Sequence, residues 1–267
     1  MSDFQQQLID LENFQTNAVI RIETLGNFVV WRDNAKVENK SWGRDKTIQL
    51  LQYLVSYRKR NALHKEKIMD NLWEDWNDRD FKVALHGINK VLEPDRASRT
   101  EPVFIVRQGV SYQIDLDKVW IDVEALEQLI IIGNSNFSSD HNIAKEAYQK
   151  AIALYKGSFL PNRIYEDWSS EEREKSQLLI LSAYITLADI LLKENPLESI
   201  RLAQNALSID ATWEDAYRIQ MQAYINKGNR PQAIKTYMKC EAILEEEYGI
   251  SPLPETKKLL KKIEEIN

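Results

Sequence analysis

The second half of the sequence repeats itself with a period of 34 residues. Asn195, which stands directly before a proline, recurs 34 residues later as Asn229. Three further positions recur in the same register: Ser199, Ala203 and Ala206 return as Ala233, Tyr237 and Cys240. Steps of three and four residues within each copy are helical. A period of this length is typical of paired helices that stack, because one pair cannot bury its apolar face alone.

The repeat predicts tetratricopeptide-like hairpins, which stack into concave surfaces that bind a protein or a peptide. From Val123 onward every apolar pattern is helical. We expect helices over residues 123–132, 141–155, 167–192, 197–208, 213–227, 230–246 and 254–265. The hairpin surface is therefore expected to bind a protein partner, with a small effector or a peptide as the alternative.

The first half has a different pattern, with short strands around Ile20 and over 28–31 that turns separate. Helical stripes follow, and then two short strands joined at Gln108-Gly109. The helices are expected over 45–58, 64–73 and 79–92, and the last strands over 103–106 and 111–114. A small sheet, three helices and a β-hairpin is the order of a winged helix-turn-helix.

These patterns predict an α+β winged helix-turn-helix followed by an all-α tetratricopeptide-like helical repeat domain. We expect an N-terminal extension over residues 1–18, with a short docking helix or a frayed tail in 1–17, the DNA-binding domain over 19–116 and the helical domain over 117–267. The 267 residues suffice for two such domains.

Charge is unevenly distributed along the chain. The formal net charge is −6, which argues against nonspecific coating of nucleic acid or of an anionic membrane. Residues 1–121 carry 18 basic and 18 acidic side chains, and the stretch from Lys40 to Lys118 carries 15 against 12. The remainder, from residue 122 onward, carries 17 against 23. The first half therefore permits a DNA-binding module.

The composition argues against a disulfide-bonded, metal-binding or membrane-spanning protein. The single cysteine, Cys240, rules out an internal disulfide and a cysteine zinc site, and we expect it to be buried. The three histidines, His64, His86 and His141, are too scattered for a metal site. The start of the chain lacks the pattern of a signal peptide, and no apolar run reaches the length of a membrane span. A cytoplasmic protein without a membrane, metal or cofactor partner is expected.

No arrangement of a nucleophile and a base suggests an enzyme. The paired acids Asp78 and Asp80, and Glu171 and Glu172, fall at predicted helix starts, where carboxylates cap the helix and favour its dipole. No glycine-rich phosphate loop is present. Most tyrosines and tryptophans stand at core spacing, so they are expected to pack rather than to stack on bases.

The helix over 79–92 divides its residues as a recognition helix does. Its core stripe is Phe81, Ala84, Leu85, Ile88 and Leu92, and the residues expected to project away are Arg79, Lys82, His86, Asn89 and Lys90. We expect Lys82, His86 and Asn89 to contact bases in the major groove. Arg79 and Lys90 are expected near phosphates. On this helix alone, an ordinary solvated face fits the pattern equally well.

Further DNA contacts are expected outside that helix. Arg44, Lys46 and Thr47, at the start of the helix over 45–58, are predicted to meet a phosphate, which the helix dipole attracts. Arg107 and Tyr112, on the terminal hairpin, are predicted to reach the flanking backbone or minor groove. The run Arg58-Lys59-Arg60 is interpreted instead as a solvated cluster that closes a helix, where cations favour the dipole.

Several motifs, in order, resemble one family over about residues 20–260. In the first half they are Leu25-Gly26-Asn27-Phe28, Leu92-Glu93-Pro94 and Arg107-Gln108-Gly109-Val110-Ser111-Tyr112, and in the second half Val119-Trp120-Ile121-Asp122-Val123, Leu154-Tyr155-Lys156-Gly157-Ser158-Phe159-Leu160-Pro161, Trp168 to Arg173, and Glu247-Tyr248-Gly249-Ile250-Ser251-Pro252. They resemble the SARP-type bacterial regulators, which join an OmpR/PhoB-type winged helix to a bacterial transcriptional activation domain. The segment over 107–112 has fewer glycines than the family's wing often shows.

The resemblance implies a transcription factor, usually an activator, that binds direct repeats in promoter DNA and contacts RNA polymerase. Self-association on tandem sites and a location in the bacterial cytoplasm follow from the same resemblance. The ATPase module of larger members and the receiver of two-component relatives have no counterpart in the sequence. The alternative is a tetratricopeptide adaptor whose winged helix no longer binds DNA, since the carboxylates of Asp78 and Asp80 would repel phosphates.

Overall fold

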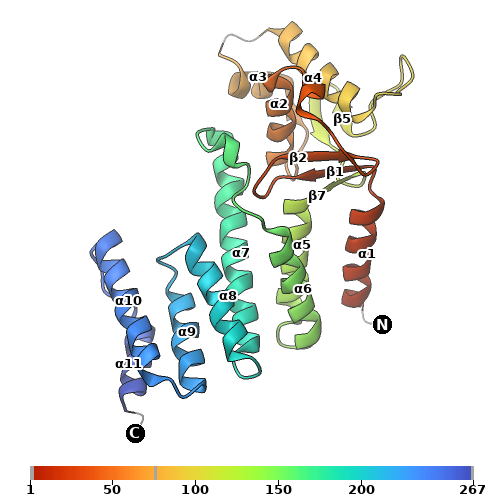
Figure 1. Ribbon diagram of the computed structural model, residues 1–267. Helices are drawn as coiled ribbons and strands as arrows, with labels where there is room; N and C mark the ends of the chain where they lie inside the picture. Colours follow the sequence, from red (N-terminus) through yellow and green to blue (C-terminus); the bar gives the residue numbers. More distant parts are fainter. Residues whose placement is uncertain (1–2, 75–76, 266–267) are drawn as a thin grey trace. The chain divides into compact units, whose positions relative to one another are not determined.

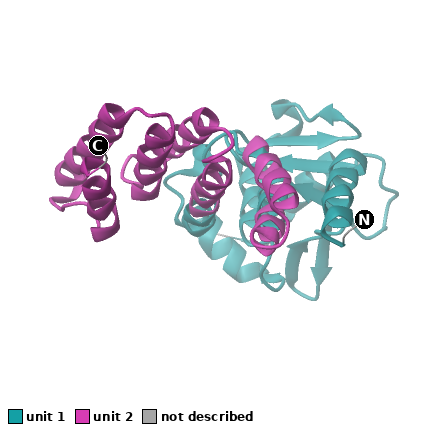
Figure 2. Cartoon of the chain, turned by 90° about the horizontal axis from the view of Figure 1, so that it is seen from below, with its two compact units in different colours: residues 1–128, 154–176 teal, residues 129–153, 177–267 magenta. Residues whose placement is uncertain are grey.

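The computed structural model describes residues 3–74 and 77–265 (Figure 1). The chain divides into two compact units, drawn in separate colours in Figure 2. Unit 1 comprises residues 1–128 and 154–176, and unit 2 comprises 129–153 and 177–267. The domain boundary expected at residue 117 therefore falls inside unit 1.

A four-stranded sheet forms one part of unit 1. Its strands are β1 (Ile20–Glu23), β2 (Val29–Arg32), β3 (Ala35–Lys36) and β7 (Val119–Ile121), in the order β3-β2-β1-β7. β1 pairs antiparallel with β2 and parallel with β7, with Ile20 opposite Val119. Parallel pairing needs a long connection, which here runs through the three helices and the hairpin. The sheet thus ties the two ends of the N-terminal region together.

The remaining elements of this region follow the predicted order, with one short strand, β4, that was not predicted. They are α2 (Asp45–Ser56), β4 (Leu63–His64), α3 (Lys65–Leu72), α4 (Asp78–Leu92), β5 (Ile105–Gln108) and β6 (Ser111–Ile114), with β4, β6 and β5 forming a second, antiparallel sheet. Residues 3–17 form the helix α1 (Asp3–Asn17), in which Leu8 is buried.

Residues 154–176 complete unit 1 from far along the chain. Their short helical turns are η2 (Pro161–Arg163) and η3 (Asp167–Ser169). Phe159 forms a β-bridge with Leu25, and the Gly26 amide donates to the Ser158 carbonyl at 3.0 Å. A side chain at Gly157, whose φ is +153°, would come within 3.1 Å of the Gly26 Cα atom. The segment fits because both residues are glycines.

Asp122 fastens the same region. Its carboxylate accepts hydrogen bonds from the Thr24 amide at 2.7 Å, the Thr24 hydroxyl at 2.6 Å and the Leu25 amide at 2.9 Å. It also caps its own helix through the Val123 amide. A buried carboxylate with four donors is stabilised by them.

The helices of the second half lie where the sequence predicts them, within three residues at each end apart from the C-terminus of α5. They are α5 (Asp122–Asn136), α6 (His141–Leu154), α7 (Ser170–Leu191), α8 (Pro196–Ile209), α9 (Glu214–Asn226), α10 (Arg230–Tyr248) and α11 (Pro254–Glu264). α8 and α9, and α10 and α9, pack as neighbouring helices of unit 2. No helix in the described part of the chain is both long and apolar enough to cross a membrane.

The 34-residue repeat appears in the structure as two equivalent helix starts. The side chains of Asn195 and Asn229 each accept a hydrogen bond, at 3.2 Å, from the amide three residues later. Such an N-cap stabilises a helix by about 1 kcal/mol. All six repeated positions are buried. Cys240 is one of them, and burial raises the pKa of its thiol to about 12, so it packs as an apolar side chain.

Candidate nucleic-acid interface

Helix α4 is capped and amphipathic. The Asn77 side chain accepts a hydrogen bond from the Asp80 amide at 3.0 Å and fixes its start. Phe81, Ala84, Ile88, Val91 and Leu92 are buried along one side. α4 packs on α2, where Gly87 lies so close to Thr47 that an added Cβ atom would approach its Cγ2 to 2.9 Å. One face of α4 is thus held firmly, and the other is left to solvent.

The exposed face of α4 carries Arg79, Lys82, Val83, His86 and Lys90. Viewed down the helix axis, at 100° per residue, these five positions fall within less than a third of the circumference. An open hollow of about 510 Å³ lies over this face, lined by Asp78 and the first four of these residues. Within the described residues, no hydrogen bond or ion pair engages the side chains of Arg79, His86 or Lys90. Three polar side chains of this face are therefore available to a ligand.

Asp78 balances part of the charge beside this face. Its carboxylate is bonded by Lys65 and, at 2.6 Å, by the Lys82 Nζ atom. These bonds, that of Lys65 first, lower the pKa of Asp78 to about 2. The carboxylate is therefore ionised and holds two lysines. Lys82 reaches DNA only by exchanging this partner for a phosphate or a base.

Asn89 does not project from the domain, as the sequence analysis expected. The residue is 6% exposed, and its Oδ1 atom is buried without a hydrogen-bond partner among the described residues. It follows Leu85 by four residues and precedes Leu92 by three, so it lies at the edge of the apolar stripe. A contact between Asn89 and a base is not available in this arrangement.

Thr47 and Tyr112 are also buried, and both support the elements around them. Thr47 packs against Gly87 on α4. The ring of Tyr112 packs edge-on against Phe81, with 5.0 Å between centroids, and so joins β6 to α4. The direct DNA contacts expected of these two side chains are replaced by roles in positioning α4 and the hairpin.

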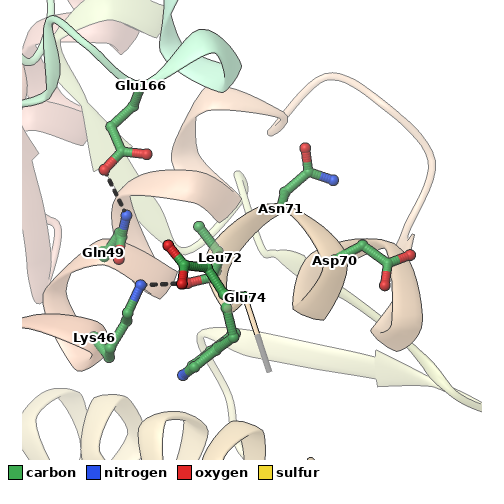
Figure 3. A pocket seen from close by; sticks show the side chains of 8 residues that line it. Lys46, Gln49, Asp70, Asn71, Leu72, Glu74 and Glu166 are labelled. Carbon is green, nitrogen blue, oxygen red and sulfur yellow. Dashed lines mark hydrogen bonds between the residues drawn. The ribbon is translucent and has the colours of Figure 1, made fainter. Parts of the chain in front are cut away.

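Arg44 and Lys46, at the start of α2, differ in their surroundings. Arg44 is exposed and has no partner among the described side chains. The Lys46 ammonium donates to the Leu72 carbonyl, as Figure 3 shows, and lies 5.6 Å from the centre of the Trp73 ring. Gln49 donates to Glu166 in the same pocket at 2.8 Å. Lys46 is therefore held within the unit, whereas Arg44 is free to meet a phosphate.

The β5–β6 hairpin presents a short exposed tip. Gly109 turns the chain with a φ of +63°, and Val110 is exposed beside it. Arg107 is exposed, and its Nε atom donates to the Gly109 carbonyl at 2.6 Å. That bond uses one of five donors, so the guanidinium keeps others for a phosphate.

The basic run at the end of α2 is not a solvated cluster. The Arg58 side chain is 1% exposed and bonds three carboxylates: Glu124 at 2.9 Å, Glu127 at 2.5 Å and Glu172 at 2.9 Å. The sequence shows nothing of this, because the three glutamates lie 66, 69 and 114 residues away. Glu172 thus serves Arg58, in addition to standing in the first turn of α7 as expected.

The other cations of the run are also paired. The Lys59 Nζ atom lies 2.6 Å from Glu127 and 3.1 Å from Glu124, and the Arg60 Nη2 atom lies 2.5 Å from Glu171. Lys175 bonds Glu127 at 2.8 Å. The cations of the run are therefore occupied by ion pairs within unit 1.

Unit 2 contains a smaller hollow of its own. It measures about 260 Å³, and α7 and α9 supply most of its lining. Its lining residues are Phe137, Ile185, Thr186, Asp189, Asp215, Arg218, Ile219 and Gln222. Arg218 is paired with Asp215, which leaves Asp189 as the carboxylate there without a described partner. No cluster of potential metal ligands occurs among the described residues.

Comparisons with known proteins give a family model and a similar solved structure. No curated protein matches the chain significantly. Among solved structures, Mycobacterium tuberculosis EmbR in complex with a low-affinity phosphopeptide matches with a TM-score of 0.77 and 16% identity. The match covers 92% of this chain and 65% of the EmbR chain, so this chain spans less than two thirds of that protein's length.

A second solved structure, the MamA protein, matches with 17% identity over 79% of this chain and 99% of its own, and its TM-score of 0.26 is too low to support a common fold. The profile of the bacterial transcriptional activator domain matches residues 121–264, more than half of the chain. The chain therefore belongs to the bacterial transcriptional activator domain family.

Proposed function

We propose that this protein is a SARP-type transcriptional regulator, a sequence-specific DNA-binding activator whose α2, α3, α4 and β5–β6 hairpin act as a winged helix-turn-helix. The observation that carries the proposal is the exposed face of α4, on which Arg79, His86 and Lys90 have no described partner. A helix fits the major groove, where such donors distinguish base edges. The cations at the end of α2, Arg58, Lys59 and Arg60, are instead paired with carboxylates.

The structure suggests a revised division of labour among the expected contacts. Arg79, Lys82 and His86 line the hollow on α4 and are assigned to base edges. The exposed cations around it, Arg44, Lys90 and Arg107, are assigned to phosphates, which position the protein without reading sequence. Lys46, Thr47, Asn89 and Tyr112 are assigned to support. The resemblance adds direct repeats, tandem protomers and RNA polymerase as the partner of the helical repeat.

The proposal is tested by fluorescence anisotropy with the protein's own upstream promoter DNA and a scrambled duplex across a salt series. Each phosphate contact contributes about −0.9 to the slope of log affinity against log salt. We expect tighter binding to the promoter and a slope equivalent to several contacts. The double variant Arg79→Ala/Lys82→Ala should lose at least tenfold in promoter affinity and most of the preference over the scrambled duplex.

A matched control removes the same charge from unit 2. Lys235 and Lys239 are exposed on α10, and Lys235→Ala/Lys239→Ala should bind the promoter as the parent does. Equal losses in both double variants would show that net charge, and not α4, governs binding. If the folded protein does not bind DNA even at low salt, the result would favour a protein-interaction adaptor. The carboxylates of Asp78 and Asp80 beside this face are consistent with that alternative, because they would repel phosphates.

A further inference from the structure

Val83 is an apolar side chain at the centre of the exposed face of α4. It lies one turn after Arg79 and three residues before His86, and the residue is 42% exposed. The other apolar residues of α4 are buried or half-buried. A single exposed valine is ordinary on a protein surface. Its position carries the argument, because it forms part of the wall of the hollow between the side chains assigned to base edges.

We propose that Val83 recognises the C5-methyl group of a thymine in the DNA site. The inference rests on the proposed function and adds a base identity to it. In the major groove the thymine methyl is the apolar group among the base edges, and the donors around Val83 suit the acceptors of a neighbouring guanine. Valine is also stiff at χ1, so little rotamer freedom is lost on contact.

The charges around Val83 favour DNA as the occupant of the hollow. Arg79 and Lys82 line the hollow, and Lys90 lies about two helical turns after Val83 on the same face. An apolar protein partner would strip water from these cations without pairing them, which is costly. A DNA groove supplies base acceptors and phosphates for the cations and one methyl group for the valine at the same time. The single carboxylate in the hollow, Asp78, is already bonded by two lysines.

The test removes the methyl group from the DNA. Within the bound promoter segment, each thymine is replaced in turn by deoxyuridine, which lacks only the C5-methyl, and affinity is measured by anisotropy. At one position in each repeat of the DNA site we expect the affinity of the parent protein to fall about three- to fivefold, which is the effect of leaving one methyl group unburied. The variant Val83→Ala should bind the thymine site more weakly and lose nothing further with deoxyuridine there.

Val103→Ala serves as the matched control, since Val103 is as exposed as Val83 but lies outside α4, and this variant should keep the full response to deoxyuridine. Circular dichroism confirms that each variant is folded. Specific binding that no deoxyuridine weakens, or an undiminished response in Val83→Ala, would overturn the inference and leave the proposed function intact. If the parent protein binds promoter and scrambled DNA equally well, the result would instead overturn the proposed function, and this inference with it.

Discussion

Two basic regions of the first half, the run Arg58-Lys59-Arg60 and the exposed face of α4, look equivalent in the sequence and differ in the structure. Every cation of the run is paired with glutamates of α5 or α7. On α4 only Lys82 is paired, and with an exposed aspartate one turn away. The difference teaches that carboxylates supplied from far along the chain decide whether a basic segment serves the fold or a ligand.

The largest expected effect breaks the buried side of this comparison. Arg58→Met leaves Glu124, Glu127 and Glu172 without their common partner, and removing one member of a buried ion cluster costs about 3–5 kcal/mol. We expect the free energy of unfolding in urea to fall by that amount. Affinity for DNA, measured where the variant is still folded, should stay within twofold of the parent.

Lys59→Ala is the control for Arg58, because its side chain is 40% exposed and its loss should cost at most about 1 kcal/mol. Similar losses of stability for the two variants, or a selective loss of DNA affinity in Arg58→Met, would remove the distinction between the regions.

A second prediction concerns pH. Burial alone would raise the pKa of Glu127, but hydrogen bonds from Lys175 and Lys59 and the charge of Arg58 outweigh it, so the pKa lies below its ordinary value of 4.5. The unfolded chain therefore takes up this proton first as the pH falls. The stabilisation is complete well above pH 4.5 and is lost as the pH drops through the lowered pKa.

Glu127→Gln should accordingly be less stable at pH 7 by about 2 kcal/mol and lose less stability than the parent between pH 5 and pH 3. Urea unfolding at several pH values measures both effects. Glu101→Gln, which changes an exposed residue without a described partner, should stay within about 0.5 kcal/mol of the parent at pH 7. A parallel pH profile for Glu127→Gln would contradict the assignment.

The smallest expected effect sharpens the exposed side of the comparison. Asp78→Asn removes a negative charge from the hollow and releases Lys65 and Lys82. Promoter affinity should rise by about two- to tenfold, with a salt slope steeper by about 1 for one added phosphate contact. Asp95→Asn, at an exposed position beyond α4, controls for net charge. Weaker binding by Asp78→Asn would mean that its carboxylate contacts the DNA site itself.

The local parts of the fold could be predicted from the sequence, and the long-range parts could not. Helix α4 was predictable because its apolar stripe repeats at helical spacing from Phe81 to Leu92. β7 was not predicted as a strand, since it has three residues, all buried, and its partner β1 lies about 100 residues earlier. Periodicity within a short window carries no information about such pairing.

The candidate site shows the same limit. Arg79, Lys82, His86 and Lys90 were predicted to be exposed, and they are, because they sit opposite the apolar stripe. Asn89 was misplaced because it lies at the border of that stripe, where neighbouring elements decide burial. Val83 was not considered as a contact because it is apolar, although its helical spacing from Arg79 and His86 places it on the exposed face, where it is 42% exposed.

The pairing of β1 with β7 also sets the order in which this protein becomes complete during synthesis. At about 5–20 residues per second, the open edge of β1 waits some 5–20 s for β7, and Leu25 waits longer for Phe159. By then α5 and α6 have already been made. A chain interrupted earlier would carry α4 beside an unfinished sheet, so unit 1 is complete only after the helices α5 and α6 have been made.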